Sequence, residues 1–490
     1  MQLAKFLIPR RVRDLLLRRD TSEAVLHPDA ATIDVVKAAP PPSPLAPVDL
    51  TDPGQVSGVM DIAARIGGIL LSSGTSNSDA KEQIHAVASA YGLHYCHVDI
   101  TLNTITVFTI VGTSNRAPIS VFRVVRKLTI DFSKLSEVDR LIRSIQAGAT
   151  PPEVAEKALD ELIAAPPPFG LKMSLFGWSL MAAAVAVLLG GNALVAAISA
   201  ASALVIMGGS AWLDSKRLPV FFQNIYGGFV ATMPAAVMYH FVISQGFQLA
   251  PGQIIASGIV VMLAGLTLVQ ALQDGITGAP VTAGARFFET MLLTGGIVAG
   301  VGIGLEVSAY LGISLPLYET SPTTGFSSAT VKVISGAIAS AGFTIACYSE
   351  WSSVFISGLA SVTGSGIYYL VLLPQGLGPV VGIGIAATMI GLFGGLLARR
   401  FRVPPLITAV AGITPLLPGL AIYRGMYAIM HDQMVVGYSA MTLALAIATS
   451  LAAGVVLGEW VARKLRRPPM FRPYQAMQRL RSSPFKRPVA

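Results

Sequence analysis

The residues best able to do chemistry in this chain are polar side chains set at the ends of long apolar runs. The densest group closes one run and opens the next: Gln270, Gln273, Asp274, Thr277, Arg286 and Glu289. Charged and amide groups are costly inside a bilayer, so those beside apolar runs are candidates for contact with a polar solute. We expect Asp274 to meet an ammonium group or a proton. The alternative is an ordinary loop in which Arg286 and Glu289 pair one helical turn apart.

A second group lies in a proline-broken segment near the C-terminus and comprises Thr414, Pro415, Pro418 and Arg424. Proline removes a donor from the helical ladder, and a broken helix can direct partial charges at a substrate. A zwitterionic amino acid suits the two groups together, with its carboxylate at Arg424 or a helix N-terminus and its ammonium at Asp274 or free carbonyls. A kink without a ligand is the alternative. Gln223 and Asn224, at the head of another apolar run, can add polar contacts, and a helix cap at the membrane interface is the alternative.

Familiar catalytic signatures do not accompany these groups. The sequence holds no Gly-x-Ser-x-Gly elbow, His-Glu-x-x-His motif or phosphate-binding loop, which argues against an enzyme and against an ATP-driven pump. We therefore expect an ion gradient as the energy source and no cofactor. His94, Cys96, His97 and Asp99 would alternate between the faces of a strand, so no four-ligand metal site is expected there.

Composition predicts the elements that must position these residues. The chain has 490 residues, of which 53% are hydrophobic and 12% charged, whereas soluble proteins carry about 25% charged residues. Apolar runs of about 20 residues, long enough to cross a bilayer, recur through the C-terminal two thirds. They start near Leu171, Ala193, Phe221, Gln253, Phe288, Ser328, Ser353, Pro379, Pro404 and Val435. The chain is therefore predicted to be a polytopic α-helical membrane protein with ten transmembrane helices.

A small α+β cytoplasmic domain is predicted at residues 49–168, after a basic N-terminal segment and a Pro-rich linker at 1–48. Helical and alternating hydrophobic periodicity distinguish its elements. We expect helices at 56–71, 78–91, 135–146 and 152–164, and two strands at 94–110 and 119–128.

Positive charge predicts that both ends of the membrane region face the cytoplasm. The tail 463–490 is rich in Lys and Arg and holds no acid, as is typical of segments facing anionic lipid. If the tail and the α+β domain lie on the same side of the membrane, the number of spans between them must be even. Ten spans meet this condition. The basic residues are not interleaved with aromatics on a recognisable module, so no nucleic-acid partner is expected. The expected partner is the lipid bilayer. The sequence permits either a monomer or a homo-oligomer.

An internal repeat is indicated by two similar segments, Gly258–Leu268 and Gly412–Ile422. It divides the membrane region into five-helix halves at 169–325 and 326–462. Because each half holds an odd number of helices, the second is predicted to be inverted, a common construction of secondary transporters around a midplane site. Chance similarity between Gly/Leu-rich helices is the alternative.

Several motifs resemble those of the threonine/serine exporter family, ThrE. They are Ser72-Ser-Gly-Thr-Ser-Asn-Ser-Asp79, Gln273-Asp-Gly-Ile-Thr-Gly-Ala-Pro280, Ala285-Arg-Phe-Phe-Glu289 and Gly412-Ile-Thr-Pro-Leu-Leu-Pro-Gly-Leu-Ala-Ile-Tyr-Arg-Gly425. The resemblance implies a bacterial inner-membrane protein that exports L-threonine and L-serine, driven by the proton motive force. It does not imply which side chains bind substrate. Alternatives are an exporter of another small metabolite such as a dicarboxylate, a passive channel, or a membrane-anchored enzyme or sensor.

Overall fold

The computed structural model describes residues 48–465, apart from 112–116, 126–130, 149, 245–249, 263, 314 and 316–327. The predicted basic N-terminal segment, most of the Pro-rich linker and the basic tail beyond Leu465 lie outside the described residues. So does the far end of the second predicted strand.

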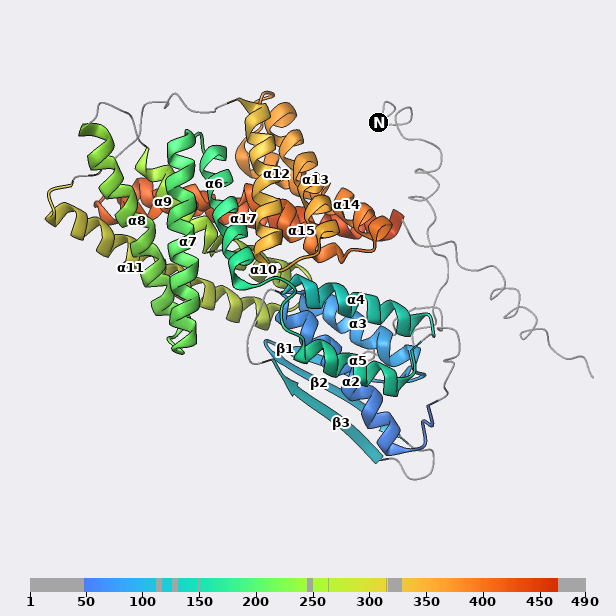
Figure 1. Ribbon diagram of the computed structural model, residues 1–490. Coiled ribbons are helices and arrows are strands. Elements are labelled where there is room, and N and C mark those ends of the chain that lie inside the picture. The colour runs from blue at the N-terminus through green and yellow to red at the C-terminus, as the bar shows by residue number, and fades with distance from the viewer. Residues whose placement is uncertain are drawn as a thin grey trace, which may run out of the picture. The chain divides into compact units, whose positions relative to one another are not determined.

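An α+β region precedes the membrane helices (Figure 1). Its elements are α2 (Pro53–Ser72), α3 (Asn77–Ala90), β1 (His97–Thr101), β2 (Thr104–Val111), β3 (Ala117–Val124), α4 (Phe132–Gln146) and α5 (Pro152–Ala164). The strands form an antiparallel sheet in the order β1-β2-β3. Helices α2 and α3 pack on the sheet, and α4 and α5 pack on those helices. The side chains of Asp52 and Ser76 cap α2 and α3 by accepting backbone N–H bonds, which satisfies donors that a helix start leaves free.

The first predicted strand is wrong, because residues 94–110 form two strands joined by a two-residue turn. Thr101 pairs with Thr104 across the turn, and Leu102 has a φ of 55°, in the left-handed region that such hairpins use. A turn of two residues does not disturb the alternation of hydrophobic residues, so the pattern alone could not locate it. His94 and Cys96 consequently precede β1.

Eight helices in the described part of the chain are long and apolar enough to cross a membrane alone. They are α6 (Leu171–Leu188), α7 (Ala193–Ser215), α8 (Val220–Ser244), α11 (Pro280–Tyr310), α12 (Ala329–Ala346), α13 (Trp351–Gly366) with its π-helical continuation η2 (Ile367–Leu372), α14 (Pro379–Phe401) and α17 (Met434–Leu465).

Two bent helix pairs raise the number of candidate spans to as many as ten. One joins α9 (Pro251–Val261) to α10 (Ala264–Ile276) with a bend of 49°, and the other joins α15 (Pro405–Ile413) and the 3₁₀ turn η3 (Thr414–Leu416) to α16 (Gly419–Met430) with a bend of 47°. These breaks fall in the two segments that define the predicted repeat. The chain is therefore a polytopic helical membrane protein.

One predicted helix start needs correction. The helix expected near Phe288 begins at Pro280, whose missing N–H suits the first helical turn. Arg286 and Glu289 thus lie within α11, not at its head. The polar residues there masked the true start, because hydropathy locates the apolar part of a helix and not its end.

Equivalent helices of the two halves pack on equivalent neighbours. Helix α8 packs along α11 as α14 packs along α17. A Cβ atom on Gly300 would lie 2.1 Å from the carbonyl oxygen of Ile225, and one on Gly458 would lie 2.2 Å from that of Thr388. In both pairs successive glycines meet successive turns of the partner in the same order, so the helices run parallel. Only glycine permits such close approach of two backbones.

Helices α6 and α12, each the first of its half, pack against each other in opposite directions. Gly177 lies against Ala346, whereas Met181, one turn later, lies against Gly342. At the same place the aromatic ring of Phe343 meets those of Trp178 and Phe132 edge-on, both at 5.9 Å between centroids. Because Phe132 belongs to α4, the α+β region and the membrane helices share one hydrophobic core.

The α+β region contacts the membrane helices at three places. At the α12–α13 connection, Phe132 N donates to Cys347 O (3.0 Å), and Arg140 pairs with Glu350 (2.8 Å). Arg463, in the last turn of α17, pairs with Asp79 (2.7 Å). The third contact, with the α10–α11 connection, contains the first group of candidate site residues.

Candidate functional site

Asp274 and Arg286 form a buried ion pair between α10 and α11. Arg286 Nη1 donates to Asp274 Oδ2 at 2.6 Å. Asp274 is 0% exposed and Arg286 8% exposed. The pairing of Arg286 with Glu289, weighed from spacing alone, is not what the structure shows, since Glu289 is exposed. A buried pair of this kind holds two opposite charges where neither could remain alone without a large desolvation penalty.

Asn77, at the start of α3, joins the α+β region to this pair. Its backbone N–H donates to Asp274 Oδ1 (3.2 Å), and its side-chain amide donates to Thr282 Oγ1 (2.8 Å). Leu102 N, in the β1–β2 turn, donates to the same hydroxyl (3.1 Å). We call Asn77, Asp274, Thr282 and Arg286 the junction cluster. Sequence reasoning missed Asn77 and Thr282, although Asn77 lies within a motif that resembles the exporter family.

The other predicted residues near the junction cluster have mostly structural contacts. Gln270 lies with its amide nitrogen against Gly74. The Thr277 hydroxyl donates to the carbonyls of Gln273 (2.9 Å) and Asp274 (3.3 Å), closing the end of α10. Asn224 donates to Leu293 O (3.1 Å) and links α8 to α11.

The second predicted group lines a cavity of about 550 Å³, a size typical of ligand pockets. Its walls come from the end of α6, from η2, from the starts of α14 and α17, and from the broken span. Residues lining it include Leu188, Tyr368, Tyr369, Thr414, Pro415, Pro418, Arg424 and Ser439. Arg424 is exposed and brings a positive charge to an otherwise largely apolar wall.

The two broken spans meet at their breaks. A Cβ atom on Gly419, at the start of α16, would lie 2.2 Å from Val260 Cγ2, near the end of α9. Val260 also lines the cavity. Breaks expose carbonyl and N–H groups that a continuous helix would satisfy, and such backbone is tolerated at membrane depth where it faces protein or a water-filled cavity. The cavity therefore reaches the point where both halves interrupt their helices.

The structure places the two predicted groups in different surroundings. The junction cluster lies where α10 and α11 meet the α+β region, and none of its members lines the cavity. The cavity is lined instead by the end of α6, by η2 and the start of α14, and by α16 and the start of α17. A single site between Gln270–Asp274 and Pro415–Arg424 was predicted. In the structure the first segment lies at the α10–α11 connection and the second at the cavity, and substrate binding by either stays a prediction.

A row of buried serines along α13 was also missed. Ser353, Ser357, Ser361 and Ser365 are each 0% exposed, and Ser349 before the helix is 1% exposed. Elsewhere buried hydroxyls such as that of Thr344 donate to the carbonyl one turn back, but these five have no hydrogen-bond partner. A residue repeat of four keeps them on one helical face, so the spacing could have revealed them from sequence.

This row ends beside the cavity. A Cβ atom on Gly336 of α12 would lie 2.9 Å from Ser365 Oγ and 3.4 Å from Pro415 Cβ. Ser349, at its other end, lies next to Glu350, which pairs with Arg140 of the α+β region. The row of hydroxyls thus leads from the α+β region toward the broken span.

The group around β1 offers no local metal site. Burial raises the pKa of the Cys96 thiol to about 11, whereas the thiolate is the form that binds metals. Its Sγ lies 3.6 Å from His85 Nδ1. Within the described ranges, no group of three or more His, Cys, Asp or Glu residues could hold a metal ion.

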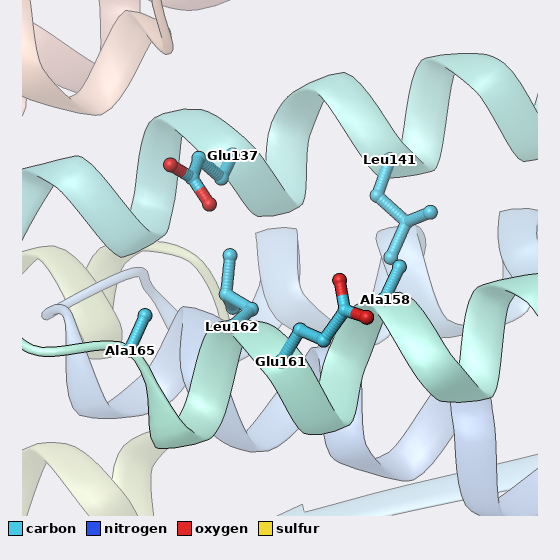
Figure 2. A pocket seen from close by; sticks show the side chains of 6 residues that line it. All are labelled: Glu137, Leu141, Ala158, Glu161, Leu162 and Ala165. Atoms are coloured by element: carbon cyan, nitrogen blue, oxygen red, sulfur yellow. The ribbon is translucent and has the colours of Figure 1, made fainter.

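A smaller hollow of about 300 Å³ lies between α4 and α5. Figure 2 shows Glu137 on one helix and Glu161 on the other, with Leu141 and Leu162 between them. Two carboxylates without a nearby cation or nucleophile among the lining residues make this a groove between surface helices, not a catalytic centre.

A cavity at the break of a membrane helix, in a bundle of up to ten spans, defines a membrane transport protein rather than an enzyme. The comparisons with known proteins agree. Residues 61–308 match the threonine/serine exporter family model ThrE, and residues 332–461 match a second model, described as "Threonine/Serine exporter, ThrE". The boundary between the two matches falls between α11 and α12. This chain belongs to the threonine/serine exporter family.

Two curated relatives align over most of the chain. The "Threonine/serine exporter" of Corynebacterium glutamicum is 61% identical over 93% of this chain and 93% of its own length. The "Probable threonine/serine exporter" of Mycobacterium tuberculosis is 36% identical over 83% of this chain and 77% of its own length. No solved structure matches the chain.

Proposed function

We propose that this protein exports L-threonine and L-serine from the cytoplasm, by alternating access and at the expense of the proton motive force. The contact between two helix breaks beside a cavity is the observation that carries the proposal, because broken helices at a midplane site are how secondary transporters bind small polar solutes. The two relatives are named as threonine/serine exporters, which supports threonine and serine as the substrates.

Ten crossings arranged as two inverted repeats underlie this mechanism. Helices α8 and α11 run parallel, which requires the bent pair α9–α10 to return the chain once across the membrane. The same holds for α14, α15–α16 and α17. The opposed packing of α6 and α12, the equivalent first helices, supports inversion of the second half.

The α+β region then lies on the cytoplasmic side. Its contacts are with the α10–α11 and α12–α13 connections and the end of α17, all of which follow an even number of crossings. Exposed basic residues also lie at helix ends that follow an even number of crossings, in agreement with the preference of positive charge for the cytoplasmic face. They are Lys216 and Arg217 after α7, and Arg400 and Arg402 at the end of α14. The helix ends that line the cavity follow an odd number of crossings, so the cavity faces the outside.

The cavity has groups suited to an amino acid with a hydroxyl side chain. Arg424 can bind the carboxylate, and carbonyls freed near Pro415 and Pro418 can accept from the ammonium group. The serine row can line the inner part of the path when α12 and α13 separate, because its hydroxyls lack other partners. In this scheme Gln270, Gln273, Asp274, Thr277, Arg286 and Glu289 act on the cytoplasmic side, and Asp274 stays the proposed partner of an ammonium group or proton.

Efflux from cells tests the proposal. Cells loaded with threonine through a dipeptide should accumulate it in the medium against its gradient when they make this protein, and an uncoupler should stop the uphill flux. Arg424→Gln should lower the rate at least tenfold, whereas Arg402→Gln, on an exposed connection, should not. Equal efflux from cells that lack the protein would sink the idea, and uncoupler-insensitive efflux that never exceeds equilibrium would identify a channel.

A further inference from the structure

The junction cluster contains buried polar atoms for which no residue in the described part of the chain provides a hydrogen-bond partner. Arg286 Nη1 binds Asp274, but Arg286 Nε and Nη2 are buried without a hydrogen-bond partner. Asn77 Oδ1 and Thr75 Oγ1 are buried and unpartnered as well. All three side chains are more than nine-tenths buried, with exposures of 8%, 4% and 7%. Unpaired buried donors on a charged group are strongly unfavourable, so this arrangement indicates a missing partner.

The chemistry of the free atoms defines that partner. Nε and Nη2 form the edge of a guanidinium group that donates two parallel hydrogen bonds to a carboxylate. The first turn of α3 lies beside the same cluster, with its positive end directed there through the Asn77 N–H bond to Asp274. An oxyanion such as a carboxylate is thus favoured over an apolar group.

Charge balance narrows the ligand further. Asp274 already neutralises Arg286, so a simple anion would leave the closed cluster with a net negative charge. An α-amino acid carries an ammonium group as well, and Asn77 Oδ1 together with Asp274 can accept from it. The whole would then be neutral, which is the condition for burying ionised groups at low cost.

We propose that Arg286, Asn77 and Thr75 form a binding site for the zwitterionic head of an α-amino acid, built jointly by the α+β region and the membrane helices. The choice of an amino acid rests on the proposed function, while the carboxylate specificity rests on the free guanidinium edge alone. Since Asn77 and Thr75 belong to one part and Arg286 to the other, occupancy holds the α+β region onto the α10–α11 connection. The site lies apart from the cavity.

Binding to the full-length protein in nanodiscs tests this. Radiolabelled threonine is measured by equilibrium dialysis, with Arg424→Gln present throughout to weaken the cavity site. We expect Arg286→Lys, which keeps the charge but loses the two-donor edge, to lower the remaining affinity at least tenfold. Arg463→Lys is the matched control, because it also contacts the α+β region but is half-exposed; its affinity should not change.

Competition and hydrogen exchange complete the test. Propionate should compete weakly, ethanolamine should not compete, and threonine should slow exchange of the amides at the start of α3. If Arg286→Lys does not fold, Thr75→Val removes a single hydroxyl and should still weaken binding. Three results would overturn the site. They are unchanged binding in both variants, competition by ethanolamine equal to that of unlabelled threonine, and water as the only occupant of the cluster. Export in cells is measured separately, so a chain that exports threonine without this binding refutes the inference alone.

Discussion

At the scale of single residues, burial decides what each polar group can do. The same pair of residue types, aspartate and arginine, occurs twice at the border of the α+β region with different consequences. Asp274 and Arg286 are buried, whereas Asp79 and Arg463 are about one third and somewhat less than half exposed. Water screens the second pair, so its contribution to stability is expected to be about 0–1 kcal/mol.

Replacement of Asp274 by Asn should therefore do more than remove a possible ligand. It leaves the buried Arg286 charge uncompensated, which costs about 3–5 kcal/mol. We expect Asp274→Asn to insert in the membrane, to lower the melting temperature in detergent and to abolish threonine efflux. Asp79→Asn is the control and should change both little. Normal export by Asp274→Asn would remove this carboxylate from the mechanism.

The cysteines should be unreactive in the folded chain. Burial raises the pKa of Cys96 to about 11, so at pH 8 about one thiol in a thousand is ionised. Because the folded pKa is raised, the reactive thiolate appears only as pH rises toward 11. A maleimide at pH 7.5 should label Cys96 and Cys347 at least a hundredfold faster after unfolding in detergent. Rapid labelling of the native protein would contradict the buried positions.

At the scale of elements, glycines on α11 and α17 set the distance between helix axes. Gly296, Gly300 and Gly304 repeat every fourth residue along α11, and Gly454 and Gly458 do the same on α17. In both cases the partner backbone occupies the space of a side chain. The pairs α8–α11 and α14–α17 thus pack in the same way.

Adding one methyl group to a glycine of α11 tests whether the helix needs glycine at the contact with α8 or at any position. Gly300→Ala places a Cβ atom 2.1 Å from Ile225 O, so the helices must separate, at an expected cost of about 1–3 kcal/mol. Gly295→Ala, on the same helix with nothing within 4 Å, should be neutral or slightly stabilising. Thermal stability in detergent and folded yield measure the difference. Equal behaviour of the two variants would mean that α8 and α11 do not pack this closely.

The hydroxyl row on α13 permits a prediction for the transport path. Ser357→Ala keeps the approximate volume of the side chain and removes the hydroxyl, so folded yield should stay within about twofold of the parent chain. If the row lines the inner path, threonine efflux should fall several-fold. Thr442→Val, an exposed position on α17 whose hydroxyl bonds to its own helix, serves as the control. Unchanged efflux in Ser357→Ala would assign the row to helix packing.

At the scale of the whole molecule, the crossing number decides which face each site meets. With ten crossings, the α10–α11 connection and the helix ends that line the cavity would lie on opposite sides of the membrane. With eight crossings and two re-entrant pairs, α8 and α11 would run in opposite directions, which disagrees with their glycine contacts.

Single cysteines in a chain lacking Cys96 and Cys347 test the arrangement. Lys216→Cys and Arg402→Cys should react with a membrane-impermeant maleimide only after cells are permeabilised. Asp432→Cys, exposed between α16 and α17, should react in intact cells. Reaction of Arg402→Cys and Asp432→Cys from the same side would mean that α15–α16 does not cross, and the inverted repeat would then fail.

Much of the architecture was predictable because membrane spans depend on local composition. Hydropathy located nine of the ten span starts within a few residues, and the breaks coincide with glycine and proline signals in the repeated segments. The hairpin at Leu102 escaped because a two-residue turn keeps the alternation in phase. The start of α11 escaped because its first three turns carry Thr282, Arg286 and Glu289 among apolar residues, which lowers the hydropathy there.

The sequence by itself thus determined the class of protein, the number of apolar runs and the polar residues worth testing. Only the tertiary structure decided how those residues are grouped. Asn77 and Asp274 are 197 positions apart, and no periodicity reports which helix end will meet which loop. The predicted substrate residues separated into the junction cluster and the cavity because packing brings together helix ends that are far apart along the chain, and local patterns do not contain that information.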